Sequence, residues 1–160
     1  LSRLLLKRMR ERSISCAPGA KRALPERYVE RERGLLQCIS PALPGDVPFG
    51  DFINEGSCDF YGAPVAVILS IDDVFSSARL TDTGILVGYL VLAAHALGLG
   101  TCPIGLITAF EDEIRETLNL PDEKNVVLGI AVGYPDPDAP LNGCRSERAP
   151  LEELVRWREG

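Results

Sequence analysis

The most constraining feature of this sequence is a stretch of roughly 17 residues that is apolar on nearly every side of a helix. Thr81 or Asp82 offers an N-cap with acid in the first turn, and Gly98 and Gly100 supply a left-handed stop at the other end. The stretch is shorter than the ~20 residues of a membrane-spanning helix, and Gly88 interrupts it. A helix without a polar face must be buried, so we expect it at the centre of the fold or in a subunit interface.

Three apolar runs predict strands around this helix. Residues 63–71 and 125–132 are continuous, β-branched runs of the kind found in buried strands. Residues 101–106 contain Pro103, which removes a backbone donor, so we expect an edge strand or an irregular extended loop there.

Two further helices are predicted after the apolar one. Thr108-Ala-Phe-Glu111 matches a capping box that would open a helix ending at residue 118 or 120. Pro150 at a first helical position predicts a short helix over residues 151–157. Strands and helices alternate along the chain, and this order alone would favour parallel βαβ units.

The N-terminal third has a different character. Residues 1–57 combine a basic helical segment with a linker rich in proline and glycine, ahead of a core at residues 58–160 within one domain. Charged, leucine-rich spacing at residues 3–12 and 24–38 predicts two exposed helices. Three prolines in residues 40–50 predict a linker or a long surface loop.

Charge and cysteine content exclude several classes of function. The net charge is −6, and residues 34–160 hold nineteen acidic against seven basic side chains, which argues against a nucleic-acid role. Five widely spaced cysteines without a C-x-x-C pair favour reduced thiols in a cytoplasm over a disulfide scaffold. A single histidine argues against a zinc site.

Several residues allow two interpretations, one in which they bind a ligand or react and one in which they only support the fold. Residues 101–105 could run close under a flat ligand, with Gly105 allowing backbone N–H groups to approach it, or could simply follow a helix stop. Arg145 and Arg148 precede the Pro150 helix and could receive a phosphate, or could pair with nearby glutamates. Cys102 and His95 could form a nucleophilic pair, although a small buried cysteine beside a helix end is the simpler interpretation.

Six short segments, none specific by itself, follow one another along about two thirds of the chain, residues 58–158. They are Phe60-Tyr-Gly-Ala-Pro-Val, Thr81-Asp-Thr-Gly84, Leu92-Ala-Ala with Gly98-Leu-Gly-Thr-Cys-Pro, Ile114-Arg with Leu118-Asn-Leu-Pro, Gly129-Ile-Ala-Val-Gly-Tyr-Pro-Asp136, and Ser146-Glu-Arg-Ala-Pro150. This ordered set resembles the flavin-dependent nitroreductase superfamily.

The resemblance implies an α+β sandwich with a mainly antiparallel central sheet flanked by helices, and a homodimer that binds FMN. It implies that Pro103, Ile104, Gly105 and Leu106 run along the isoalloxazine ring. It also implies that Arg148 holds the FMN phosphate with Arg145 as helper. The helix that begins near Asp82 would pack across the dimer. No catalytic side chain and no metal ligand are expected, because the flavin carries the hydride chemistry.

One departure from the family pattern concerns the N-terminus. The family's initial Arg-x-Ser-x-Arg segment and the Pro-Ser-x-x-Asn-x-Gln-Pro-Trp region that follows it do not occur in this sequence. We therefore expect an N-terminally incomplete or reduced member of the family.

The function implied by the resemblance is an FMN-dependent oxidoreductase. It would transfer electrons from NAD(P)H to a nitroaromatic, quinone or enone acceptor by a ping-pong mechanism. One alternative is a flavin-free homologue that acts as a dimerising or ligand-binding module. Another is a thiol hydrolase that uses Cys102. We expect no nucleic-acid or membrane partner.

Overall fold

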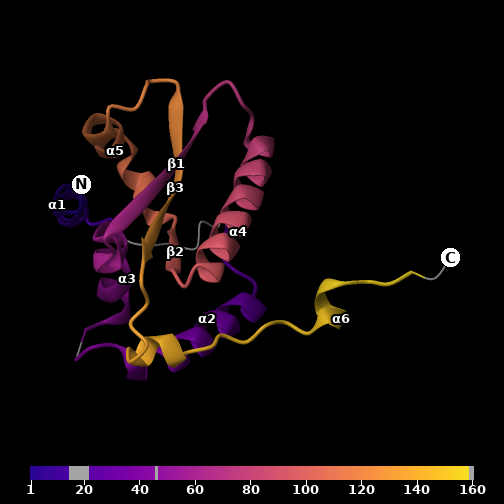
Figure 1. Cartoon of the computed structure of the whole chain (residues 1–160). Helices are drawn as coiled ribbons and strands as arrows, with labels where there is room; N and C mark the ends of the chain where they lie inside the picture. The colour runs from indigo at the N-terminus through magenta and orange to yellow at the C-terminus, as the bar shows by residue number, and fades with distance from the viewer. Residues whose placement is uncertain (15–21, 46, 159–160) are drawn as a thin grey trace. The chain divides into compact units, whose positions relative to one another are not determined.

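The computed structural model describes residues 1–14, 22–45 and 47–158 of the chain (Figure 1). These residues form two compact units, which we describe separately. The first unit comprises residues 1–17 and 50–136, and the second comprises residues 18–49 and 137–160.

The first unit is built on a three-stranded antiparallel sheet. Its strands are β1 (Val65–Asp72), β2 (Gly100–Ile104) and β3 (Lys124–Gly133), and they lie in the order β1-β3-β2. Both neighbouring pairs run antiparallel. The parallel βαβ arrangement suggested by element order is therefore wrong, and the antiparallel α+β fold implied by the resemblance is confirmed.

Burial differs between the strands. β3 is the central strand and buries Val126, Ile130 and Ala131, as its apolar run predicts. β1 was also expected to be buried, but none of its residues is, and the Val65 side chain is 52% exposed. A β-branched run therefore identified the strand but not its burial, because β1 occupies an edge of the sheet. β2 occupies the other edge, which confirms the expectation drawn from Pro103.

The described helices of this unit are α1 (Ser2–Arg12), α3 (Phe49–Cys58), α4 (Leu80–Ala96) and α5 (Glu111–Leu118). Short 3₁₀ turns occur at Phe60–Gly62, Ser77–Arg79 and Leu106–Phe110. The linker expected over residues 40–50 ends earlier than predicted, because α3 already begins at Phe49.

The core of the first unit gathers side chains from nearly every element. Its largest fully buried members are Phe110, Leu5, Ile107, Ile114, Ile130 and Cys58. Leu5 and Met9 come from α1, so the expectation that this helix is exposed is wrong. Two apolar residues four positions apart suffice to dock a helix that is otherwise charged.

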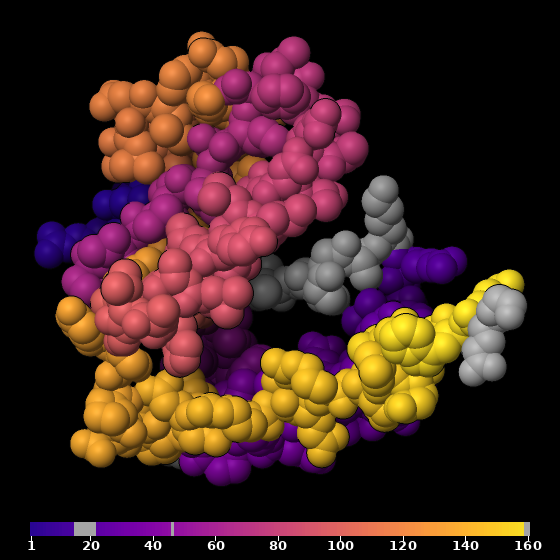
Figure 2. All heavy atoms as spheres, turned by 45° about the vertical axis from the view of Figure 1, so that its right-hand side comes forward, coloured from indigo at the N-terminus to yellow at the C-terminus, as the bar shows by residue number. Residues whose placement is uncertain are grey.

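The apolar helix α4 has the expected length of 17 residues and the expected Gly98 stop, with φ of +76°. Its start differs, because the cap position is Arg79 and no side chain caps it. Of its residues only Ala94 is buried, whereas Tyr89 is 71% and Leu92 is 67% exposed. In Figure 2 the atoms of α4 lie uncovered on the side of the first unit that faces the viewer. Central burial within this chain is therefore ruled out for α4.

The capping box predicted for α5 is absent as well. The cap position is Phe110, and the Thr108 hydroxyl instead donates to the Gly105 carbonyl at 2.9 Å. The Glu111 carboxylate accepts from the backbone N–H of Val126 at 2.9 Å and pairs with Arg115 at 2.9 Å. This residue therefore ties α5 to the sheet rather than closing a capping box.

The second unit contains α2 (Glu26–Ile39), 3₁₀ turns at Ser40–Ala42 and Pro140–Gly143, and α6 (Leu151–Leu154). No residue of α2 is buried, as expected for an exposed helix. α6 spans four residues instead of the seven expected, and Pro150 is its cap and not its first residue. None of the helices in the described parts of the chain is long and apolar enough to cross a membrane.

Candidate functional site

The segment expected to contact a ring system lies at the end of β2. Pro103 and Ile104 pair with Ile130 and Gly129 of β3, and Ile104 is buried in the core. Pro103 and Gly105 are exposed, and Leu106 is half-buried where the 3₁₀ turn begins. The alternation anchors the segment through Ile104 and leaves the residues on either side of it open to a ligand.

Gly105 marks the most open point of this segment. A Cβ placed there would meet no atom within 4 Å, and its φ of −81° is accessible to any residue. Conformation therefore does not require glycine at this position, whereas a flat ligand lying against the backbone would. Because β2 is an edge strand, no strand among the described residues pairs with the backbone groups on its open side.

The two candidate phosphate ligands lie in the second unit, and both are exposed. Arg145 donates to the carbonyl oxygens of Asn142 at 2.6 Å and Cys144 at 3.0 Å. Arg148 donates to Ser146, at 3.0 Å to its carbonyl and 2.6 Å to its hydroxyl, and to the Glu147 carbonyl at 3.2 Å. Both guanidinium groups thus bond to nearby groups of their own loop instead of pairing with the glutamates considered from the sequence.

The helix that follows these arginines does not strengthen an anion site as expected. α6 has four residues, too few to add a helix-terminal field to the guanidinium charge. Any anion at Arg145 or Arg148 must therefore rely on the guanidinium groups themselves.

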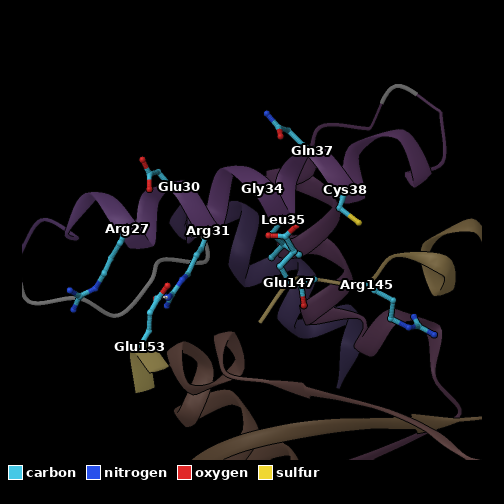
Figure 3. Close-up of a pocket in the computed structure, with 11 residues that line it drawn as sticks. Arg27, Glu30, Arg31, Gly34, Leu35, Gln37, Cys38, Arg145, Glu147 and Glu153 are labelled. Atoms are coloured by element: carbon cyan, nitrogen blue, oxygen red, sulfur yellow. Dashed lines mark hydrogen bonds and ion pairs between the residues drawn. The ribbon is translucent and has the colours of Figure 1, made fainter. Parts of the chain in front are cut away.

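A pocket of about 670 Å³ opens between α2 and the loop that carries Arg145 (Figure 3). The α2 residues Arg27 and Arg31 point into it, and Arg145 lies at its other end. Three glutamates balance these charges, and one of them, Glu153, pairs with Arg31 at 3.0 Å. The lining suits a polar ligand that carries both acceptors and donors.

Sequence reasoning missed the α2 side of this pocket. Arg27 and Arg31 are four residues apart and therefore lie on one face of α2, which was the available signal. The Arg27 guanidinium lies 4.8 Å from the centroid of the Tyr28 ring, and its hydrogen bond to the hydroxyl lowers the pKa of Tyr28. Arg27 is thus partly engaged by its neighbour.

The geometry does not favour a Cys102 nucleophile. Cys102 is exposed on β2 instead of buried as expected, and desolvation by the surrounding protein raises the pKa of its thiol. His95 lies in the last turn of α4, and within the described parts of the chain no hydrogen bond joins it to Cys102. A cysteine that serves as the nucleophile of a hydrolase requires a lowered pKa and an adjacent base. Likewise, among the residues the structure describes, no cluster of ligands could hold a metal ion.

Comparison with known proteins decides the family. The model of the nitroreductase family matches residues 4–134. The chain belongs to the nitroreductase family. It is 37% identical over 90 residues to a 4-nitrobenzoate reductase of Pseudomonas putida, an alignment that covers 56% of this chain and 40% of the relative. It is 30% identical over 136 residues to a 4-nitrobenzoate reductase of Nocardioides sp., covering 82% of this chain and 55% of the relative.

Solved nitroreductases show the same fold. The FMN-dependent nitroreductase NfnB of Mycobacterium smegmatis, solved with NADPH, superposes with a TM-score of 0.80 at 27% identity. That superposition covers 99% of this chain and 72% of NfnB. An FMN- and NADPH-dependent NfnB from sphigopyxis sp. strain HMH gives 0.82 at 20% identity, with 99% and 76% covered. The chain spans about half the length of the curated nitroreductases it matches.

The predicted site residues thus fall into two sets. The chain places Pro103, Ile104, Gly105 and Leu106 consecutively at one edge of the sheet in the first unit. It places Arg145 and Arg148 in one loop of the second unit, where Arg145 lines the pocket.

Proposed function

We propose that this chain contributes to an FMN-dependent oxidoreductase that passes electrons from NAD(P)H to a nitroaromatic compound. Membership of the nitroreductase family supports this, as do relatives named for nitroaromatic reduction and for FMN or NADPH. The observation that carries the proposal is the open edge of β2 next to Gly105, where no described residue lies within 4 Å of the place that a Cβ on Gly105 would occupy.

The types of residue present are those that can bind the ring and the phosphate of a flavin mononucleotide. Pro103, Ile104, Gly105 and Leu106 would line its ring, because Ile104 fixes the strand in the core while its neighbours stay open. Arg145 and Arg148 would hold the phosphate by exchanging hydrogen bonds to their own loop for charge-assisted bonds to phosphate oxygens. When bound, the flavin supplies hydride transfer, so the chain's own residues have only to bind and orient.

A site of this kind would serve donor and acceptor in turn, which predicts ping-pong kinetics and room for quinones and enones as further acceptors. We also propose a cytoplasmic location, where the widely spaced cysteines stay reduced at rest.

We further propose that the exposed apolar face of α4 is covered by a second copy of the chain in a homodimer. Ile85, Leu86, Tyr89 and Leu92 are each more than half exposed. A contiguous apolar face of this kind is typical of an interaction surface.

The direct test is binding of FMN, measured by equilibrium dialysis, with oxidation of NADPH by 4-nitrobenzoate as the activity readout. Gly105→Leu should weaken FMN binding at least about tenfold, because the side chain would occupy the space of the ring. Ala109→Leu adds a similar bulk at an exposed position of the 3₁₀ turn that follows Gly105 and should leave FMN affinity unchanged.

The phosphate ligands are tested in the same assay. Arg148→Ala should weaken FMN binding about tenfold. This is the lower end of the effect expected from losing a charge-assisted hydrogen bond, because the Arg148 side chain is exposed to solvent. Absence of FMN binding by the chain would contradict the proposal and favour a flavin-free module. Equal affinity of wild type and Arg148→Ala would remove Arg148 from the site.

A further inference from the structure

Two cysteine residues of the second unit lie side by side, although 106 positions separate them in the sequence. The Cys144 thiol contacts the backbone carbonyl oxygen of Cys38, with 3.1 Å between sulfur and oxygen. Cys38 lies in the last turn of α2, and Cys144 directly follows the turn at Pro140–Gly143. Both are half-buried free thiols.

The Cys38 side chain is also near enough to influence the Cys144 thiol. Desolvation and, after it, the neighbouring Cys38 raise the pKa of the Cys144 thiol. The Cys144 sulfur lies beside the backbone of Cys38, so the two side chains share one surface of the second unit, and a disulfide requires that their sulfurs approach to bonding distance. Cys38 lines the pocket and its sulfur points to the side of α2 where Arg145 lies (Figure 3), so a small oxidant can reach it from solvent.

We propose that Cys38 and Cys144 form a reversible dithiol–disulfide site whose oxidant is a hydroperoxide. In the first step one thiol gives up its proton and attacks the peroxide oxygen, which forms a sulfenic acid and releases water. In the second step the other thiol attacks that sulfur, the S–O bond breaks, the S–S bond forms and a second water leaves. Two thiols lose two electrons in total, and one hydrogen peroxide is reduced to two waters.

The bond would join α2 to the loop that carries Arg145. In the described residues of the second unit, an ion pair joins α2 to α6, Arg31 with Glu153, and both of those side chains are about half exposed. A disulfide would add a covalent link next to Arg145 and fix one wall of the pocket. Thiol reductants would reverse the link.

The chain carries its own internal control. Cys58 is fully buried in the core of the first unit, and burial raises its pKa to about 11. Peroxide in solvent cannot contact its sulfur without local opening of the core, whereas Cys38 and Cys144 are only half-buried. Oxidation at Cys58 should therefore be at least about tenfold slower than at the Cys38–Cys144 pair.

The experiment treats the reduced, folded wild-type chain with hydrogen peroxide, blocks free thiols at intervals with N-ethylmaleimide, and maps the peptides by mass spectrometry. We expect loss of two hydrogen atoms, one linked peptide pair containing Cys38 and Cys144, and full reversal by dithiothreitol. Stable sulfinic acid at either residue would overturn the proposal. So would a link to Cys16 or a link between two chains.

The peptide map of the wild-type chain tests the proposal by itself. Cysteine variants then test which residues form the link. Cys38→Ser and Cys144→Ser should each abolish the linked pair. Cys102→Ser removes an exposed cysteine of the other unit and should form the pair at the wild-type rate. A Cys102→Ser chain that no longer forms the link would contradict the assignment.

Discussion

Helices α1 and α4 of the first unit show opposite relations between sequence and burial. α1 is charged on most sides, yet it inserts Leu5 and Met9 fully into the core. α4 is apolar on nearly every side, yet within this chain it buries only Ala94. The comparison shows that the burial of a helix face depends on which element packs against it. The hydrophobicity of the face determines only how unfavourable its exposure to water is when no element covers it.

Electrostatics add to this difference. Glu113 of α5 is buried, and its carboxylate pairs with both Arg8 and Arg12 of α1. The arginines are about half exposed, so solvent screens part of the attraction. α1 is thus held by an apolar pair and by an ionic cluster, whereas α4 offers mainly apolar surface.

The largest effect is expected from removing the apolar anchor of α1. Leu5→Ala should lower the free energy of unfolding by about 2–5 kcal/mol, because it leaves a cavity at a fully buried position. Leu92→Ala makes the same chemical change on exposed α4. In a dilute, monomeric sample, urea unfolding should show that Leu92→Ala lowers the free energy of unfolding by no more than about 0.5 kcal/mol. Equal losses for the two variants would break the comparison.

The next effect concerns the proposed second copy on α4. Leu92→Asp should weaken self-association about 10- to 100-fold, because the interface would bury an unpaired charge. Sedimentation at several concentrations measures this. Lys7→Asp also introduces an acidic residue, but on the exposed side of α1, and should not change the association. A wild-type chain that stays monomeric at micromolar concentration would rule out the dimer.

A smaller effect is expected at the ionic cluster. Glu113→Gln should cost about 1–2 kcal/mol of unfolding free energy, because Arg8 and Arg12 lose a buried partner but can turn to solvent. Glu116→Gln removes the same charge from an exposed position of α5 and is the matched control. If both variants unfold at the same urea concentration, the ionic cluster contributes nothing to the docking of α1.

The smallest effect is expected at the start of α4. Thr81→Ala and Asp82→Ala should each change the free energy of unfolding by less than about 0.5 kcal/mol, because neither side chain caps the helix. A loss near 1 kcal/mol for either variant would show that the capping inferred from the sequence operates in solution.

The sequence predicted best those elements that need only local information. The β-branched run at residues 125–132 located β3 to within one residue at each end, and Gly98 correctly ended α4. Pro103 correctly placed β2 at an edge of the sheet. These signals work because backbone hydrogen bonding and φ are properties of the residue itself.

The failures share a physical reason. Both predicted caps were wrong because a 3₁₀ turn leads into each helix, at Ser77–Arg79 and at Leu106–Phe110, so that the expected cap residue lies inside a helix or turn already formed. The burial of α1 and the meeting of Cys38 with Cys144 depend on partners about a hundred residues away. No local pattern contains that information.

The ionic cluster of α1 also has a consequence for when this helix can dock during synthesis. Arg12 and Glu113 are 101 residues apart, and at about 5–20 residues per second a ribosome needs roughly 5 to 20 seconds to make the intervening chain. During that time the side chains of Leu5 and Met9 have no core to enter. Residues 2–12 of the growing chain therefore lack the buried partners that dock them until α5 leaves the exit tunnel.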